Sequence, residues 1–188
     1  GLREFHHYLV KQHGVEPLPS LEAALGEDAG LLPVDANLIS FDDYAAAQTW
    51  LETPRLNSKP LVITQIAQLV LMFAFRLGMR RREIWGLLLD DVDVDGEISI
   101  IVRPNATRRL KTPSSKRVIP AEAFLSAEEL KKLRKWVEDR TKPFKSGNDH
   151  QARSEAPLFP AQIDGRPIST ENITKVIFEA LRTVTGDR

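Results

Sequence analysis

The chain has 188 residues, 42% of them hydrophobic, and its 26 basic and 26 acidic residues balance to a net charge of zero. The hydrophobic fraction is sufficient for a real core, and the absence of cysteine excludes disulfide scaffolds, zinc ribbons and thiol chemistry. Because the overall charge favours no partner, only a local cluster of basic residues could attract a polyanion.

The N-terminal part is predicted to be a short helix followed by a linker. Apolar residues recur on one face of residues 2–13, and Gly14 is placed to end that helix. Residues 15–38 combine prolines and glycines with scattered acidic residues, which indicates a linker and a domain boundary.

Helices are predicted on both sides of an interruption at residues 54–60. Before it, Ser40 and Asp43 form a helix-start signal. After it, residues 61–77 are apolar on nearly every side, which predicts a central core helix that ends at Gly78. Polar residues interrupt this apolar segment well short of the roughly 20 residues that a membrane span needs. A second short helix is predicted over residues 81–88.

A small antiparallel sheet is predicted next. Asp95-Gly96 is a tight-turn signal, and residues 97–102 and 116–119 are rich in strand-forming residues, with residues 92–94 as a third strand.

The C-terminal part is predicted to contain two helices separated by a polar loop. A capping box at Ser126 opens a helix to about residue 140, residues 142–156 are predicted to be a mobile loop, and Ser169 caps a helix to about residue 184. The order of helices, small sheet and helices predicts a mainly helical α+β domain.

A dense group of arginines follows the long helix. Residues 78–84 read GMRRREI, with Leu87 and the pair Asp91-Val92 downstream. This series resembles the first catalytic box of the tyrosine recombinases, or phage integrases. Residues 111–120, KTPSSKRVIP, are similar to the β-hairpin of that family, in which a catalytic lysine precedes a basic strand that ends in proline.

The resemblance covers most of the chain and implies its division into domains. Residues 1–14 are similar to the last helix of the family's N-terminal core-binding domain, residues 15–38 would be the linker, and residues 39–188 would be the N-terminal part of the catalytic domain. The implied fold is the tyrosine-recombinase type, truncated before the second catalytic box.

The family's reaction at phosphorus needs a nucleophile, an acid for the leaving 5′-oxygen and fixed positive donors for the non-bridging oxygens. By resemblance, Arg80 would supply such a donor, because a planar guanidinium binds two oxygens at once. Lys111 would protonate the leaving oxygen, although Arg108 and Lys116 compete for that role. Glu83 would support the site without reacting, which is close to the alternative of a structural salt bridge. Neither a metal nor another cofactor is implied.

Further basic residues are predicted to bind DNA. A run without any acidic residue lies between the prolines at 104 and 120. In a neutral protein such a run favours a surface that follows phosphates, with the alternative of an exposed, solvated face. The predicted DNA-binding residues are Arg81, Arg108, Arg109, Lys116 and Arg117. For Arg81, solvation of a helix end is an equal alternative.

The chain departs from the family pattern in its second half. The second box and the nucleophilic tyrosine are expected after the helix that Ser169 caps, and Tyr8 and Tyr44 both lie upstream of Arg80. The sequence His150-Gln151-Ala152-Arg153 matches the pattern of the second box. Its position in a predicted polar loop favours a solvated segment over the catalytic box. The resemblance therefore predicts an inactive fragment of a recombinase.

Three functions remain open. The first is the DNA-binding and partial catalytic portion of a site-specific recombinase that works through a phosphotyrosine intermediate. The second is a non-catalytic DNA-binding or regulatory module of the same fold, and the third is a helical protein-interaction domain. For the first, double-stranded DNA is the expected partner, with a tetrameric parent, a monomeric fragment, no membrane association and a cytoplasmic, nucleoid-associated location.

Overall fold

The computed structural model describes residues 11–12, 39–53, 61–106, 108, 115–144, 150–163 and 166–186. The chain divides into two compact units, residues 1–38 and residues 39–188. Residues 11–12 are helical, as predicted. The rest of the predicted N-terminal helix and the linker lie outside the described residues, and every other described element belongs to the second unit.

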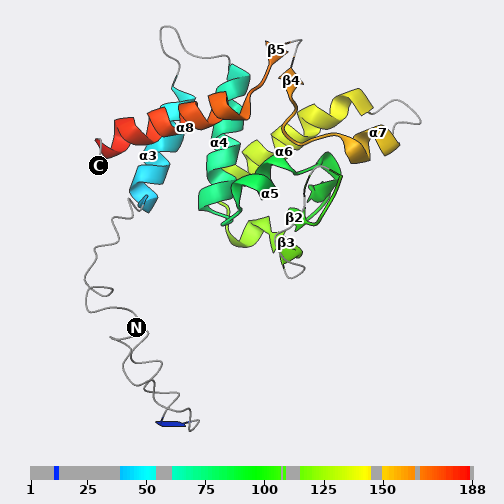
Figure 1. Cartoon of the computed structure of the whole chain (residues 1–188), viewed down its shortest axis with the longest axis horizontal. Helices are drawn as coiled ribbons and strands as arrows, with labels where there is room; N and C mark the ends of the chain where they lie inside the picture. The colour runs from blue at the N-terminus through cyan, green and yellow to red at the C-terminus, as the bar shows by residue number, and fades with distance from the viewer. Residues whose placement is uncertain are drawn as a thin grey trace, which may run out of the picture. The chain divides into compact units, whose positions relative to one another are not determined.

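Three helices form one side of this unit (Figure 1). They are α3 (Phe41–Glu52), α4 (Leu61–Phe75) and α8 (Thr170–Thr185), and α8 packs across both of the others. The predicted helix starts are confirmed. The Asp43 amide donates to Ser40 Oγ over 3.0 Å and the Ser40 amide donates to Asp43 Oδ2 over 3.1 Å, which completes a capping box. Ser169 caps α8 in a simpler way, by accepting from the Glu171 amide.

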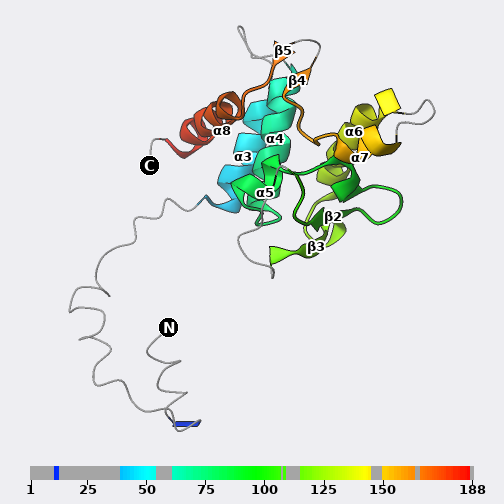
Figure 2. The ribbon, with the colours of Figure 1, turned by 45° about the vertical axis from the view of Figure 1, so that its right-hand side comes forward.

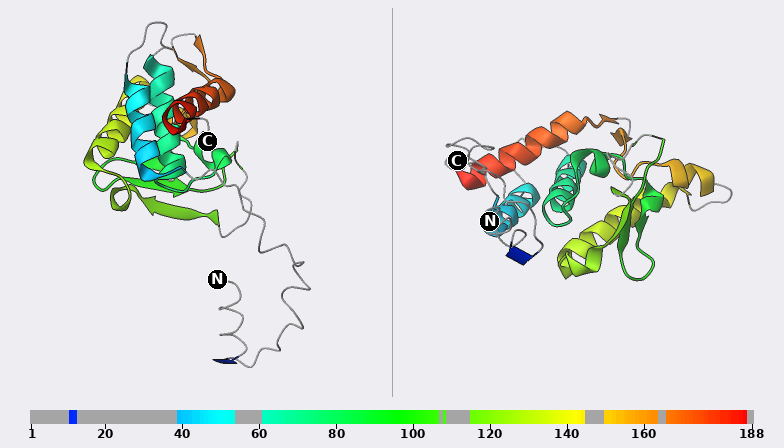
Figure 3. Two further views of the ribbon diagram at one scale, coloured as in Figure 1. Left: turned by 90° about the vertical axis from the view of Figure 1, so that its left-hand side faces the viewer. Right: turned by 60° about the horizontal axis from the view of Figure 1, so that its bottom comes forward.

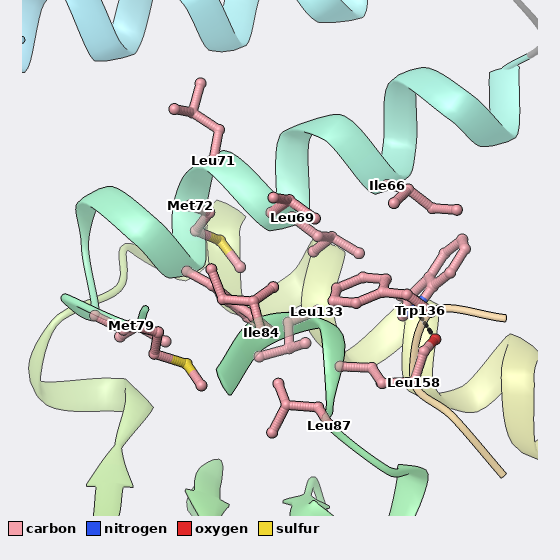
Figure 4. Packing of buried hydrophobic residues seen from close by; sticks show 14 of the residues in the cluster. Ile66, Leu69, Leu71, Met72, Met79, Ile84, Leu87, Leu133, Trp136 and Leu158 are labelled. Carbon is pink, nitrogen blue, oxygen red and sulfur yellow. Dashed lines mark hydrogen bonds between the residues drawn. The ribbon is translucent and has the colours of Figure 1, made fainter. Parts of the chain in front are cut away.

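Helix α4 is the central core helix that its composition predicts. Its residues 66–73 are buried without interruption. In Figure 4 the side chains of Ile66, Leu69 and Met72 lie toward Leu133 and Trp136, whereas Leu71 points the opposite way. Two views from other directions place α4 between the α3–α8 pair and the side that carries α6 and the sheet (Figures 2 and 3). A helix with neighbours on both sides must be apolar all round.

The small antiparallel sheet is confirmed. It has the order β1-β2-β3, with β1 at Val92–Asp93, β2 at Ser99–Val102 and β3 at Arg117–Pro120. Along the chain, the short helix α5 (Arg81–Trp85) and a 3-10 turn, η1 (Leu89–Asp91), come between α4 and the sheet.

The register of the sheet is set by its buried face. Ile100 pairs with Val92 on one side and with Ile119 on the other, and all three are buried. The adjacent Val118 is exposed, as the two-residue period of a strand requires.

Helix α6 (Ala127–Thr141) covers the other side of α4, and its start is the predicted capping box at Ser126. Its Trp136 is buried and donates through Nε1 to the Leu158 carbonyl over 3.1 Å, drawn as a dashed line in Figure 4. This bond satisfies the indole N–H and ties α6 to the segment that follows α7.

The prediction of a mobile loop over residues 142–156 is wrong for the part that the structure describes, residues 142–144 and 150–156, while residues 145–149 lie outside the described residues. A 3-10 turn, η4, spans Lys142–Phe144 and a helix, α7, spans His150–Glu155. A 3-10 turn, η3, at Ala121–Ala123 and a two-stranded ladder, β4 (Gln162–Ile163) with β5 (Arg166–Pro167), were also not predicted. In the part of the chain that the structure describes, no helix is long and apolar enough to cross a membrane.

Candidate functional site

Arg80 lies where the chain reverses between α4 and α5. Gly78 adopts a positive φ of 59°, and the Met79 amide returns to the Phe73 carbonyl over 3.1 Å. Met79 is then buried and Arg80 takes the N-cap position of α5, with 64% of its side chain exposed. The end of an apolar helix thus holds a cation at the surface.

Glu83 connects this arginine to the sheet. It is buried, and Oε2 accepts from the Arg80 amide over 3.0 Å. From β3, Arg117 donates through Nη2 to Oε2 over 2.9 Å and through Nη1 to Oε1 over 3.2 Å. The Arg80 guanidinium lies 3.7 Å from Oε1. We call Arg80, Glu83 and Arg117 the surface network.

The electrostatics of the surface network keep Glu83 ionised. Hydrogen bonds from Arg117 are the largest influence, and together with the Arg80 amide they hold the pKa of Glu83 below its ordinary value although burial opposes this. An ionised carboxylate between two arginines accepts hydrogen bonds and orients its donors. It does not supply a proton at neutral pH.

A second network lies beneath the first. Asp91 is fully buried; its Oδ1 accepts from Arg103 Nε over 2.7 Å, and its Oδ2 lies 3.4 Å from Arg108 Nη2 and accepts from the Leu88 amide over 3.0 Å. Arg108 also donates through Nη1 to the Glu83 carbonyl over 2.9 Å. We call Asp91, Arg108 and Arg103 the buried network after its buried carboxylate, although the Arg103 side chain itself is 43% exposed. This buried network meets the surface network at Glu83.

The position of Arg108 differs from the prediction that this residue binds DNA. Its side chain is only 1% exposed, and its donors are directed to groups of the protein. Burial lowers the pKa of its guanidinium, while Asp91 and Glu83 act in the opposite direction. A charge held in this way is a structural group.

The other predicted site residues lie in three kinds of environment. Arg81 and Lys116 are exposed, and among the described residues their side chains have no hydrogen-bond or ion-pair partner. Arg117, also a predicted DNA contact, directs its guanidinium to Glu83 and retains 34% exposure. Lys111 and Arg109 lie outside the described residues.

Tyr44 is the one tyrosine in the described part of the chain, and its hydroxyl is engaged inside the protein. It is buried, stacks on Phe75 at 4.6 Å between ring centroids, and donates to Glu129 Oε1 over 2.5 Å. Burial, followed by the hydrogen bond to Glu129, raises its pKa. This phenol has the properties of a packing residue.

The sequence His150-Gln151-Ala152-Arg153, which matches the pattern of the second box, lies on α7. His150 is exposed at its first position, and Arg153 pairs with Asp90 of η1 at 3.4 Å. A helix holds this motif, contrary to the prediction of a loop.

Sequence reasoning missed Arg103 and Asn105. Asn105 Nδ2 donates to the Gly86 carbonyl over 2.7 Å, and Oδ1 accepts from the Arg108 amide over 2.8 Å. The contact of Arg103 with Asp91 spans 12 positions and that of Asn105 with Gly86 spans 19, so neither contact has a local signal in the sequence. Among the described residues there is no group of three or more histidines, cysteines or carboxylates that could hold a metal ion.

Comparison with known proteins gave one match. A family model described as the phage integrase family matches residues 51–187, a segment that includes both networks and the three-stranded sheet. No curated protein and no solved structure matches the chain.

Proposed function

The chain belongs to the phage integrase family, and from this premise we propose that residues 39–188 are the part of a site-specific DNA recombinase that binds duplex DNA and supplies some of its catalytic groups. Arg80 is the donor to the non-bridging oxygens of a phosphodiester, and Lys111 is the acid for the leaving 5′-oxygen. Glu83 orients Arg80 and takes no part in the chemistry.

The observation that carries this proposal is the environment of Arg80. An exposed guanidinium stands on a backbone fixed on both sides, by the turn at Gly78 and by the capping contact to Glu83. Its contact with Glu83 Oε1, at 3.7 Å, is longer than a hydrogen bond, so the planar fork keeps donors for another oxyanion. A donor of fixed position stabilises the charge that develops on a phosphorane.

The charge around Arg80 supports binding of DNA. The surface and buried networks together contain four arginines, at 80, 103, 108 and 117, against the two carboxylates of Glu83 and Asp91. Arg81 and Lys116, which are exposed, are the sequence neighbours of Arg80 and Arg117. We propose that Arg109 acts with them. Such a local excess of positive charge attracts phosphates although the whole chain is neutral.

A DNA-binding module without cleavage is the second candidate, because the arginines around Glu83 serve it equally. Both candidates require the same DNA surface, so binding of DNA is the first property to test.

The test is a salt titration of binding to a fluorescent duplex of about 30 base pairs, with Arg80→Ala and Lys111→Ala as variants. We expect each variant to weaken binding about tenfold and to reduce the slope of log K against log salt by about 0.9. Lys142→Ala is the matched control, since Lys142 is 66% exposed against 64% for Arg80 and pairs with Asp139 at the far end of α6. The proposal would be refuted if both variants bound DNA as tightly as the unsubstituted chain, or if DNA binding did not respond to salt.

A further inference from the structure

We infer that Arg108 is a positioning residue of the DNA site: it acts on Arg80 through Glu83 and does not itself touch DNA. This inference rests on the proposed function of Arg80. Its starting point is that one buried guanidinium joins three separate segments of the chain. Nη1 reaches the Glu83 carbonyl in α5, Nη2 lies 3.4 Å from the Asp91 carboxylate in η1, and Nε donates to the Arg103 carbonyl after β2 over 2.9 Å.

The guanidinium of Arg108 is needed in the protein interior, where it pairs with Asp91. Asp91 is fully buried, and a buried carboxylate is costly unless it is paired and hydrogen-bonded. If Arg108 turned outward to a phosphate, Asp91 would keep, among the described residues, only Arg103 and the Leu88 amide. The Glu83 carbonyl would lose the Arg108 donor. The geometry therefore favours a fixed interior role over contact with DNA.

The connection from Arg108 to Arg80 runs through a single residue. The backbone carbonyl of Glu83 accepts a hydrogen bond from Arg108. Its carboxylate accepts from the Arg80 amide and from the Arg117 guanidinium. Helix α5 has only five residues, and a helix of that length is not stable by itself. Its direction, and with it the position of Arg80 at its N-cap, is set by contacts such as these.

Gly86 gives an independent sign that Arg108 is tightly placed. A Cβ added at Gly86 would lie 2.7 Å from both Cβ and Cδ of Arg108. The φ of Gly86 is −92°, which any residue adopts, so glycine is needed there for space and not for backbone conformation. The alkyl part of Arg108 packs directly on the backbone that ends α5.

The test is a double-mutant cycle on the full chain, with DNA affinity measured at 50 mM salt. Arg108→Lys keeps the charge and loses the planar fork, whereas Gly86→Ala displaces Arg108 and deletes nothing. Each is made alone and together with Arg80→Ala, and folding is followed by circular dichroism. We expect each single change to weaken binding about threefold or more, and to have almost no further effect once Arg80 is absent.

Three outcomes would overturn the inference. If Arg108→Lys weakens binding equally with and without Arg80, Arg108 acts on DNA independently or through general stability. If it lowers the salt slope further in a chain that already carries Arg80→Ala, Arg108 touches DNA directly. If both changes lower the melting temperature and leave affinity intact, the role is structural only. Failure of the proposed function is recognised separately, because Arg80→Ala alone would then have no effect.

Discussion

Glu83 determines how the site responds to pH, because its carboxylate is the common acceptor of Arg80 and Arg117. At pH 7 the carboxylate is ionised in the folded and in the unfolded chain, but only the folded chain gives it these donors. Its folded pKa lies below the ordinary value of 4.5. The stabilisation is therefore fully present above the unfolded pKa and is lost as the pH falls through the folded pKa.

We predict that Glu83→Gln lowers the free energy of unfolding by about 1–3 kcal/mol at pH 7, because the amide offers Arg117 one acceptor fewer and a competing donor. The difference from the unsubstituted chain should shrink as the pH is lowered below about 4. Urea denaturation at a series of pH values from 7 to 3 measures both quantities.

Glu52→Gln is the matched control for this experiment. Glu52 also has a lowered pKa and pairs with Lys132, but its side chain is 49% exposed and that of its partner 40%. An exposed pair contributes about 0–1 kcal/mol, so its loss should be small. The prediction would be contradicted if the two substitutions lowered the free energy of unfolding equally, or if the effect of Glu83→Gln were the same at every pH. Either result would mean that the buried contact of Glu83 with Arg117 does not stabilise the fold.

The surface network could be predicted from the sequence only in part. Arg80 and Glu83 are three positions apart across the start of a helix, so their proximity follows from the spacing. Glu83 and Arg117 are 34 positions apart, and Asp91 and Arg108 are 17 apart. Such pairs depend on how α5, η1 and β3 pack, and no local pattern indicates that Arg108 is buried while Arg81 is exposed.

At the scale of elements, the turn that ends α4 is the feature on which the site depends most directly. Gly78 has a φ of 59°, and nothing lies within 4 Å of a Cβ added there. Any cost of a side chain at this position is therefore conformational and not steric. The two residues that follow are Met79, which is buried, and Arg80, which is exposed.

We predict that Gly78→Ala lowers the free energy of unfolding by about 1 kcal/mol and also weakens binding to DNA. Gly186→Ala is the matched control, since Gly186 ends α8 with a φ of 66° and also has no neighbour within 4 Å of an added Cβ. Both substitutions should cost similar stability, and only the first should change affinity. If Gly186→Ala weakened binding as much, the effect would come from stability and not from the position of Arg80.

The elements that could be predicted are those with a local chemical signature. Serine caps predict the starts of α3, α6 and α8, and a continuous apolar run predicts α4. Helix α7 has no buried residue, so it shows no apolar period, and its contacts to η1 are remote in sequence. Arg153 of α7 pairs with Asp90, and directly after the helix the Ala156 carbonyl accepts from the Leu89 amide. Strands β4 and β5 have two residues each, which is too short for an alternating pattern.

At the scale of the whole molecule, balanced charge and a local basic site have different consequences. The 26 basic and 26 acidic residues leave no net repulsion for salt to screen in the folded chain. Several ion pairs, such as Lys142–Asp139 and Lys175–Glu171, are largely exposed and contribute little to stability. Stability should therefore respond weakly to salt. Binding of DNA releases counterions from every phosphate that a basic residue contacts, and should respond strongly.

We predict that raising the salt concentration from 50 to 200 mM lowers DNA affinity roughly 40-fold if three phosphates are contacted, because log K then falls with a slope of about −2.7. Over the same range the melting temperature should change by no more than about 2 °C, since the exposed pairs are weak and the net charge is zero. Fluorescence anisotropy and differential scanning calorimetry on one preparation measure the two responses. A melting temperature that falls steeply with salt would mean that the arginine networks stabilise the fold through exposed charge, and the loss of affinity could then reflect unfolding. A steep loss of affinity at constant melting temperature would instead assign the excess of arginine around Arg80 to contact with phosphates.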